Sequence, residues 1–200
     1  YSGKTAGYAF AAVRGSRPGL VAVVSPLHQP YPGSILTTAH RAYATPLGQL
    51  WVDEEALAAL EEAMAEGGLD LTRVSNDREH SLEIELPFLQ VALAGEFKIL
   101  PLMIRSQSPL VSLNLGKALA KVLRGRGALL VASTDLSHFY PEEMALELDG
   151  EMLRRLRDFS PDDLFNAERT GKGFACGVAA VAAAVWPAPD LGADWVEILH

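Results

Sequence analysis

Three short apolar runs, separated by helical patterns, constrain the fold of this 200-residue chain more than any other feature. The runs are Leu20–Val24 (LVAVV), Phe97–Ile104 (FKILPLMI) and Ala128–Ala132 (ALLVA). Runs this short and this rich in Val, Leu and Ile are typical of strands buried on both faces of a sheet. Strands that alternate with helices predict an α/β fold with a mainly parallel or mixed central sheet. We expect a single domain, because 200 residues that are 49% hydrophobic suffice for one sizeable core.

The intervals between these runs carry helical patterns. In the clearest, Glu54–Glu66, apolar residues recur at spacings of three and four, Asp53 caps the start and Gly67 follows the end. Further helices are expected at Lys4–Ala12, Pro109–Leu123, Pro141–Arg157, from Ser160 onward and at Gly173–Trp186. We expect a helix around His40 and an extended segment at Ala44–Val52. A further strand is expected at Trp195–Leu199.

Charge and cysteine content narrow the functional classes. The chain has a net charge of −8 and a sequence pI of about 5.1, so it lacks the excess of basic residues that is typical of nucleic-acid-binding proteins. No apolar run approaches the roughly 20 residues of a membrane span, so we expect no membrane partner. The single cysteine, Cys176, excludes an internal disulfide framework and fits a reducing compartment, which predicts a cytoplasmic protein. Because the chain opens on Tyr1 and closes on an apolar run, we expect it to be incomplete at both termini.

Polar side chains follow two of the predicted strands. Asp135 and His138 come shortly after Ala128–Ala132, and His28 lies in a Pro-rich loop after Leu20–Val24. Ligands of open α/β sheets bind just past the carboxyl ends of the strands, so these residues are candidates for a binding or catalytic site. The alternative is that Asp135 caps a short turn and His138 is an ordinary half-buried histidine, and the residues alone leave the two interpretations evenly balanced.

Two further segments carry candidate site residues. His80 and Glu83 are three positions apart, which places them on one face if Glu79–Leu93 is helical. Composition alone favours a helix with a solvated acidic start and a kink at Pro87. Cys176 lies near the start of the predicted helix Gly173–Trp186, where the helix dipole favours a thiolate; its alternative role is that of a small buried hydrophobic residue.

Several motifs together resemble the Memo family, also named AmmeMemoRadiSam system protein B. They run in the family's order and span nearly the whole chain, and EHSLEIELPFL is the most specific of them. The matching stretches are YSG (1–3), SPLH (25–28), TPLGQLWV (45–52), EHSLEIELPFL (79–89), STDLSHF (133–139) and ACG (175–177).

The resemblance implies a fold related to the catalytic subunit of class III extradiol ring-cleaving dioxygenases, which use non-haem iron. It also implies a metal pocket of two histidines and one cysteine. His28 matches the second metal histidine, Cys176 the thiolate ligand, and His138 a nearby histidine that is not a ligand. The first metal histidine belongs to a PHAGY-like segment before YSG, which this sequence does not include. His80, with Glu83, is expected in the pocket wall.

The implied donors suit redox chemistry. A thiolate in place of the carboxylate of a 2-His-1-carboxylate site softens the site, which favours copper as well as iron(II). His138 could carry protons near neutral pH, with Asp135 orienting it. We therefore expect His28, His80, His138 and Cys176 to converge on one pocket, with His40 and His200 elsewhere.

Three functions are compatible with these residues and with the resemblance. The first is a metal-dependent oxidoreductase of dioxygenase type acting on an unknown small molecule. The second is a non-enzymatic module that binds a peptide or protein in the ancestral enzyme pocket. The third is a hydrolase with Cys176 as nucleophile and His138 as base, which lacks an evident orienting group. The resemblance also implies association with AMMECR-like and radical SAM proteins.

Overall fold

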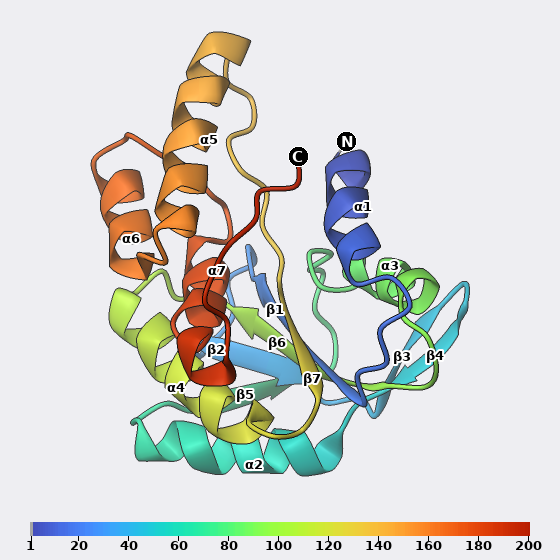
Figure 1. The fold of residues 1–200 in the computed structure, drawn as a ribbon. Helices are drawn as coiled ribbons and strands as arrows, with labels where there is room; N and C mark the ends of the chain where they lie inside the picture. Colours follow the sequence, from blue (N-terminus) through green and yellow to red (C-terminus); the bar gives the residue numbers. More distant parts are fainter. Residues whose placement is uncertain (1) are drawn as a thin grey trace.

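A mixed five-stranded sheet forms the centre of the computed structural model, which describes residues 2–200 (Figure 1). Its strand order is β5 (Leu71–Val74), β2 (Ile35–Thr38), β6 (Lys98–Ile104), β1 (Leu20–Pro26) and β7 (Ala128–Ala132). Strands β6, β1 and β7 are parallel, β2 and β5 are parallel, and only the β2–β6 pair is antiparallel. The expected single α/β domain with a mixed, mostly parallel sheet is confirmed.

Helices cover both faces of this sheet around one hydrophobic core. Figure 1 shows α4 and α7 on one side of the sheet and α1 and α3 on the other. The helices are α1 (Gly3–Ala12), α2 (Glu54–Glu66), α3 (Glu85–Ala92), α4 (Pro109–Leu123), α5 (Glu142–Arg157), α6 (Pro161–Arg169) and α7 (Val178–Val185), with a 3-10 turn at Pro189–Leu191. A separate hairpin joins β3 (Ala42–Thr45) to β4 (Gly48–Trp51). Within the described residues, no helix has both the length and the apolar character needed to cross a membrane.

The carboxyl ends of strands β1 and β7 lie next to each other. Val24 of β1 is in register with Ala132 of β7, and the Ser133 N–H donates to the Val24 carbonyl oxygen at 2.9 Å. Because the strands are parallel, the segments that follow them leave the sheet side by side. His28 and Asp135 both lie in these segments, which is why the fold brings them to the same region.

Burial differs among the three predicted strands. Every residue of β1 is buried, as is β6 after Lys98, in agreement with the prediction of strands covered on both faces. All five residues of β7 are only partly buried, so the prediction is wrong for this strand. The reason is its position: β7 is an edge strand that pairs only with β1, which leaves its outer side open.

Other sequence-based expectations also fail locally. The segment around His40 is not helical, because Ile35–Thr38 pairs with strands on both sides and Ala42–Thr45 forms the hairpin. Trp195–Leu199 joins no strand ladder of the described residues. Helix α3 begins at Glu85, so Pro87 lies in its first turn, where a missing N–H breaks no helical hydrogen bond, and not in a helix interior as the expected kink requires.

Candidate functional site

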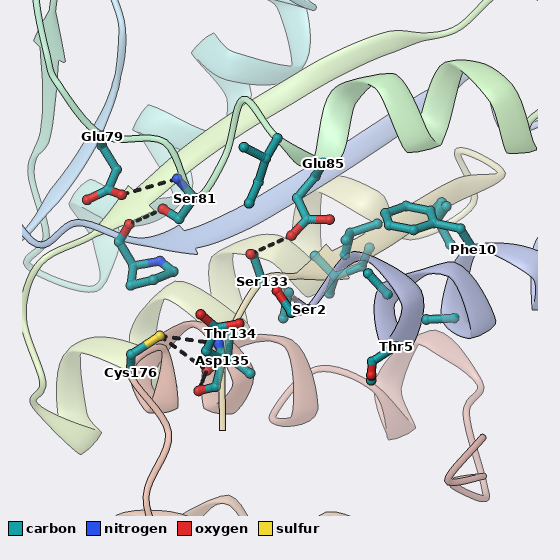
Figure 2. Close-up of a pocket in the computed structure, with 18 of the residues that line it drawn as sticks. Ser2, Thr5, Phe10, Glu79, Ser81, Glu85, Ser133, Thr134, Asp135 and Cys176 are labelled. Carbon is teal, nitrogen blue, oxygen red and sulfur yellow. Dashed lines mark hydrogen bonds between the residues drawn. The ribbon is translucent and has the colours of Figure 1, made fainter. Parts of the chain in front are cut away.

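A cavity of about 600 Å³ lies where β1 and β7 end (Figure 2). Helix α1 and the segment leading into α3 supply its other walls. One part of its lining is polar and comes from loops, including those after β1 and β7 and the one before α7: His28, Glu79, Ser81, Thr134, Asp135 and Cys176. Another part is apolar and comes from α1 and β7: Ala6, Ala9, Phe10, Val13, Leu129, Leu130, Val131 and Ala132.

Three predicted site residues meet in this cavity. His28, Asp135 and Cys176 all contribute to its lining, although they come from distant parts of the sequence. His28 follows β1, Asp135 follows β7, and Cys176 precedes α7. The expected convergence therefore holds for His28 and Cys176.

Cys176 is tied to the loop after β7 by reciprocal hydrogen bonds. Its N–H donates to the Asp135 carbonyl oxygen at 3.0 Å, and the Asp135 N–H donates to Cys176 Sγ at 3.2 Å. The Gly177 N–H donates to Thr134 Oγ1 at 2.9 Å. Because these backbone donors are held by the loop, helix α7 begins only at Val178, five residues later than expected from the sequence (178 − 173). Cys176 thus precedes the helix, and a donated N–H stabilises negative charge on its sulfur.

The approach of the two loops requires glycine at position 177. A Cβ atom there would lie 2.5 Å from the Ser133 carbonyl oxygen and 2.9 Å from Thr134 Cβ. Both are atoms of the neighbouring loop that cannot move aside without shifting its backbone. The glycine of the ACG motif is therefore explained by close packing beside the thiol.

Glu79 holds His28 in one orientation. Its Oε2 accepts the His28 backbone N–H at 2.6 Å and lies 3.0 Å from His28 Nδ1. The Glu79 side chain is 7% exposed, whereas that of His28 is 51% exposed. An ionised carboxylate only accepts hydrogen bonds, so this contact places a proton on Nδ1, while Nε2 has no hydrogen-bond partner among the described residues.

The ionised state of Glu79 follows from its contacts. Burial by itself raises the pKa of this carboxyl group, but the backbone N–H groups of His28, Ser81 and His80 together hold that pKa below its usual value. Sequence reasoning did not single out Glu79. The available signal was its position at the head of the EHSLEIELPFL motif, where acidic residues were interpreted as a solvated helix start.

A second carboxyl group, Glu85, borders the cavity between its polar and apolar parts. Ser133 Oγ donates to Glu85 Oε1 at 2.6 Å. Burial raises the pKa of Glu85 and the charge of Asp135 raises it further, whereas the hydrogen bond from Ser133 lowers it. Glu85 was also missed from the sequence, since only the fold shows that the first residue of α3 faces this cavity.

His80 and Glu83 do not line this cavity. They border a smaller recess of about 320 Å³, which shares only Glu79 with the larger one. His80 Nδ1 lies 2.8 Å from Glu83 Oε1, and both side chains are exposed. The physical reason is that His80 and Glu83 belong to the non-helical stretch before α3, which presents Ser81 and Ile84, but not these two residues, to the main cavity.

His138 is also outside the cavity lining. Its Nδ1 lies 2.9 Å from the Leu136 carbonyl oxygen, and its ring packs edge-on against Phe139 and Phe174. No hydrogen bond joins it to Asp135 or Cys176 among the described residues, because the local carbonyl group and the two rings hold the imidazole. His40 and His200 lie outside the cavity as expected.

The donor set fits the implied metal in type but not in number. An imidazole and a thiol are donors that zinc, copper and iron accept. Among residues 2–200, however, no group of three or more His, Cys, Asp or Glu side chains is placed to hold a metal ion. His28 and Cys176 supply two donors, and protein metal sites commonly use three or four.

A family model and the similar relatives point to one family, and a solved structure shares the fold. A family model described as Memo-like protein matches residues 1–200. A MEMO1 family protein of Nitrosopumilus maritimus is 31% identical over 199 residues, covering 100% of this chain and 72% of that protein. A MEMO1 family protein of Methanococcoides burtonii is 28% identical over 201 residues, covering 100% and 74%. The crystal structure of the uncharacterized protein JW3007 from Escherichia coli K12 has a similar fold, with a TM-score of 0.65 and 17% identity over 91% of this chain and 80% of that one.

Proposed function

Because the chain belongs to the Memo family, we propose that the cavity beside β1 and β7 is its functional site and serves metal-dependent redox chemistry of dioxygenase type. The observation that supports this most is that His28 and Cys176, which the family resemblance marks as ligands, line the same cavity. The substrate is a small molecule or peptide that enters this cavity.

The proposed ligands are His28 through Nε2 and Cys176 through Sγ, with iron(II) or copper as the metal. The resemblance assigns a further histidine to the segment before YSG, which would complete a set of three. Redox reactivity is what iron or copper contributes when bound. A soft thiolate donor favours copper more than a carboxylate would.

The chain's own residues prepare this site. Glu79 fixes the tautomer and direction of His28, a role that carboxylates commonly play behind metal-binding histidines. The Asp135 N–H supports negative charge on Cys176. The roles of Asp135 as an orienting group and of His138 as a proton carrier near neutral pH belong to the same proposal.

Metal content tests this proposal. In the protein as its gene encodes it, we expect Cys176→Ser and His28→Gln each to lower bound iron or copper by more than about tenfold, since loss of even an indirect support costs roughly 10–100-fold in affinity. His40→Gln is the matched control, because His40 lies outside the cavity and bonds the Ser75 carbonyl oxygen. Metal analysis after purification and a thermal melt of each variant provide the measurement.

Unchanged metal content in the two variants would favour the non-enzymatic binding module. If Cys176→Ser and His28→Gln retain as much metal as the parent, neither residue is a ligand, and a metal-independent binding module becomes the better explanation.

A further inference from the structure

We propose that this cavity selects ligands with an apolar body and a positively charged amine, and that Glu85 is the residue that recognises the amine. The inference deepens the proposed function, because it concerns the substrate class of the same site. It stands on the position of Glu85, on one unused oxygen of its side chain and on the charges around the cavity.

Glu85 and Ser133 occupy the junction between the two parts of the cavity. Figure 2 shows them between Cys176, Thr134 and Asp135 on one side and Phe10 on the other. The order of residues along the chain agrees, because β7 lines the apolar part with Leu129–Ala132 and then continues through Ser133 to Asp135. A ligand that spans both parts must pass Glu85.

One oxygen of Glu85 is committed and the other is available. Oε1 accepts the hydrogen bond from Ser133 Oγ at 2.6 Å, whereas Oε2 accepts none from the described residues. Ser133 is buried, so this hydrogen bond holds the carboxyl group in place beside the cavity. Oε2 is therefore an oriented acceptor that a ligand's donor group can reach.

The charges around the cavity oppose an anionic ligand. Glu79, Glu85 and Asp135 contribute three carboxyl groups, and no lysine or arginine is among the described lining residues. In the metal-free protein, a carboxylate or phosphate placed here would meet these three carboxyl groups with no lysine or arginine to offset them, and such repulsion is strong where water is partly excluded. A cation gains from the same arrangement.

Glu85 is the carboxyl group best suited to bind that cation. Glu79 already accepts hydrogen bonds from three backbone N–H groups and one imidazole, and Asp135 is exposed to water. Burial raises the pKa of Glu85, which means that its charge lacks solvation in the unliganded protein. An ammonium group would supply the missing counter-charge.

The apolar part of the cavity determines the rest of the ligand. Its walls are small, aliphatic or aromatic side chains, among them Ala9, Leu130 and Phe10. Phe10 is fixed by stacking on Phe88, with ring centroids 5.0 Å apart. A preformed apolar wall of this kind suits an aromatic ring or a branched alkyl group.

Three probes of one shape test the inference on metal-free protein treated with a chelator: 2-phenylethylamine, 2-phenylethanol and 3-phenylpropanoate. Binding is followed by NMR titration. We expect the amine to bind roughly tenfold more tightly than the alcohol, as a hydrogen bond to a charged group predicts, and the carboxylate not to bind. Glu85→Gln should remove the preference for the amine, whereas Glu147→Gln, the same change on an exposed face of α5, should keep it.

Each contrary result overturns the inference. It is wrong if 3-phenylpropanoate binds as well as the amine, if none of the three probes binds, or if Glu85→Gln retains the preference. The metal proposal fails separately, because its readout is metal content. Cys176→Ser should lose metal and keep the amine preference, and Glu85→Gln should do the reverse.

Discussion

The carboxyl group of Glu85 carries a stability cost that depends on pH. Burial raises its pKa first, and the negative charge of Asp135 adds to the effect, against the hydrogen bond from Ser133. A carboxyl group with a raised folded-state pKa holds its proton more tightly in the folded protein than in the unfolded one. Its ionisation at neutral pH therefore lowers the free energy of unfolding, and the loss disappears as the pH falls below both pKa values.

Glu85→Gln should consequently raise the melting temperature slightly at pH 7, because the amide avoids the charge and can still accept the hydrogen bond from Ser133. The gain should shrink towards zero at about pH 4 and below, where the parent's carboxyl group is increasingly protonated. Thermal melts of both proteins at the two pH values provide the measurement. A Gln variant that is less stable than the parent at pH 7 would show that the carboxylate is stabilised by the fold.

Sequence reasoning identified the site residues whose chemistry is conspicuous and missed those whose role depends on position. His28 and Asp135 could be found because each follows an apolar run, and Cys176 because it is the single cysteine. Glu79 and Glu85 could not, since a carboxylate at a helix start is usually solvated and only the fold places these two against a cavity.

At the level of elements, the site depends on how closely two loops approach. The loop after β7 and the segment before α7 are joined through Thr134, Asp135, Cys176 and Gly177. The run of small apolar residues predicted a longer helix, because hydrogen bonds from Cys176 and Gly177 to a distant loop leave no local signal. The partial exposure of β7 could not be predicted either, since an apolar run can form an edge strand or a central strand with the same sequence.

Gly177→Ala should destabilise the protein by about 1–3 kcal/mol, the usual cost of overpacking, because the added Cβ meets Ser133 and Thr134. Gly150→Ala in α5 is the matched control: nothing lies within 4 Å of its Cβ position, so it should stabilise by about 0.5–1 kcal/mol. Urea denaturation of the two variants measures both effects. Equal effects of the two substitutions would mean that the loops can separate without cost.

On the scale of the whole molecule, the strand order creates the site. Placing β1 between β6 and β7 sets the ends of β1 and β7 next to each other, although about a hundred residues separate them. The α/β class and most helices follow from local periodicity, as α2 and α4 show. The order of the strands in the sheet does not follow from local periodicity. It depends on which apolar faces the connecting helices cover, and the spacing of apolar residues does not show this.

The central claim is that Cys176 and His28 bind one metal ion, and cobalt(II) reports on it most directly. Cobalt accepts the same nitrogen and sulfur donors as copper and iron, and a thiolate bound to it gives a charge-transfer absorption band in the near ultraviolet. Titration of the protein as its gene encodes it should produce this band with saturation at one cobalt per chain. Cys176→Ser should abolish the band, and His28→Gln should weaken binding while the band persists at high cobalt. Cobalt binding without the band, or the same spectrum in Cys176→Ser as in the parent, would contradict the claim.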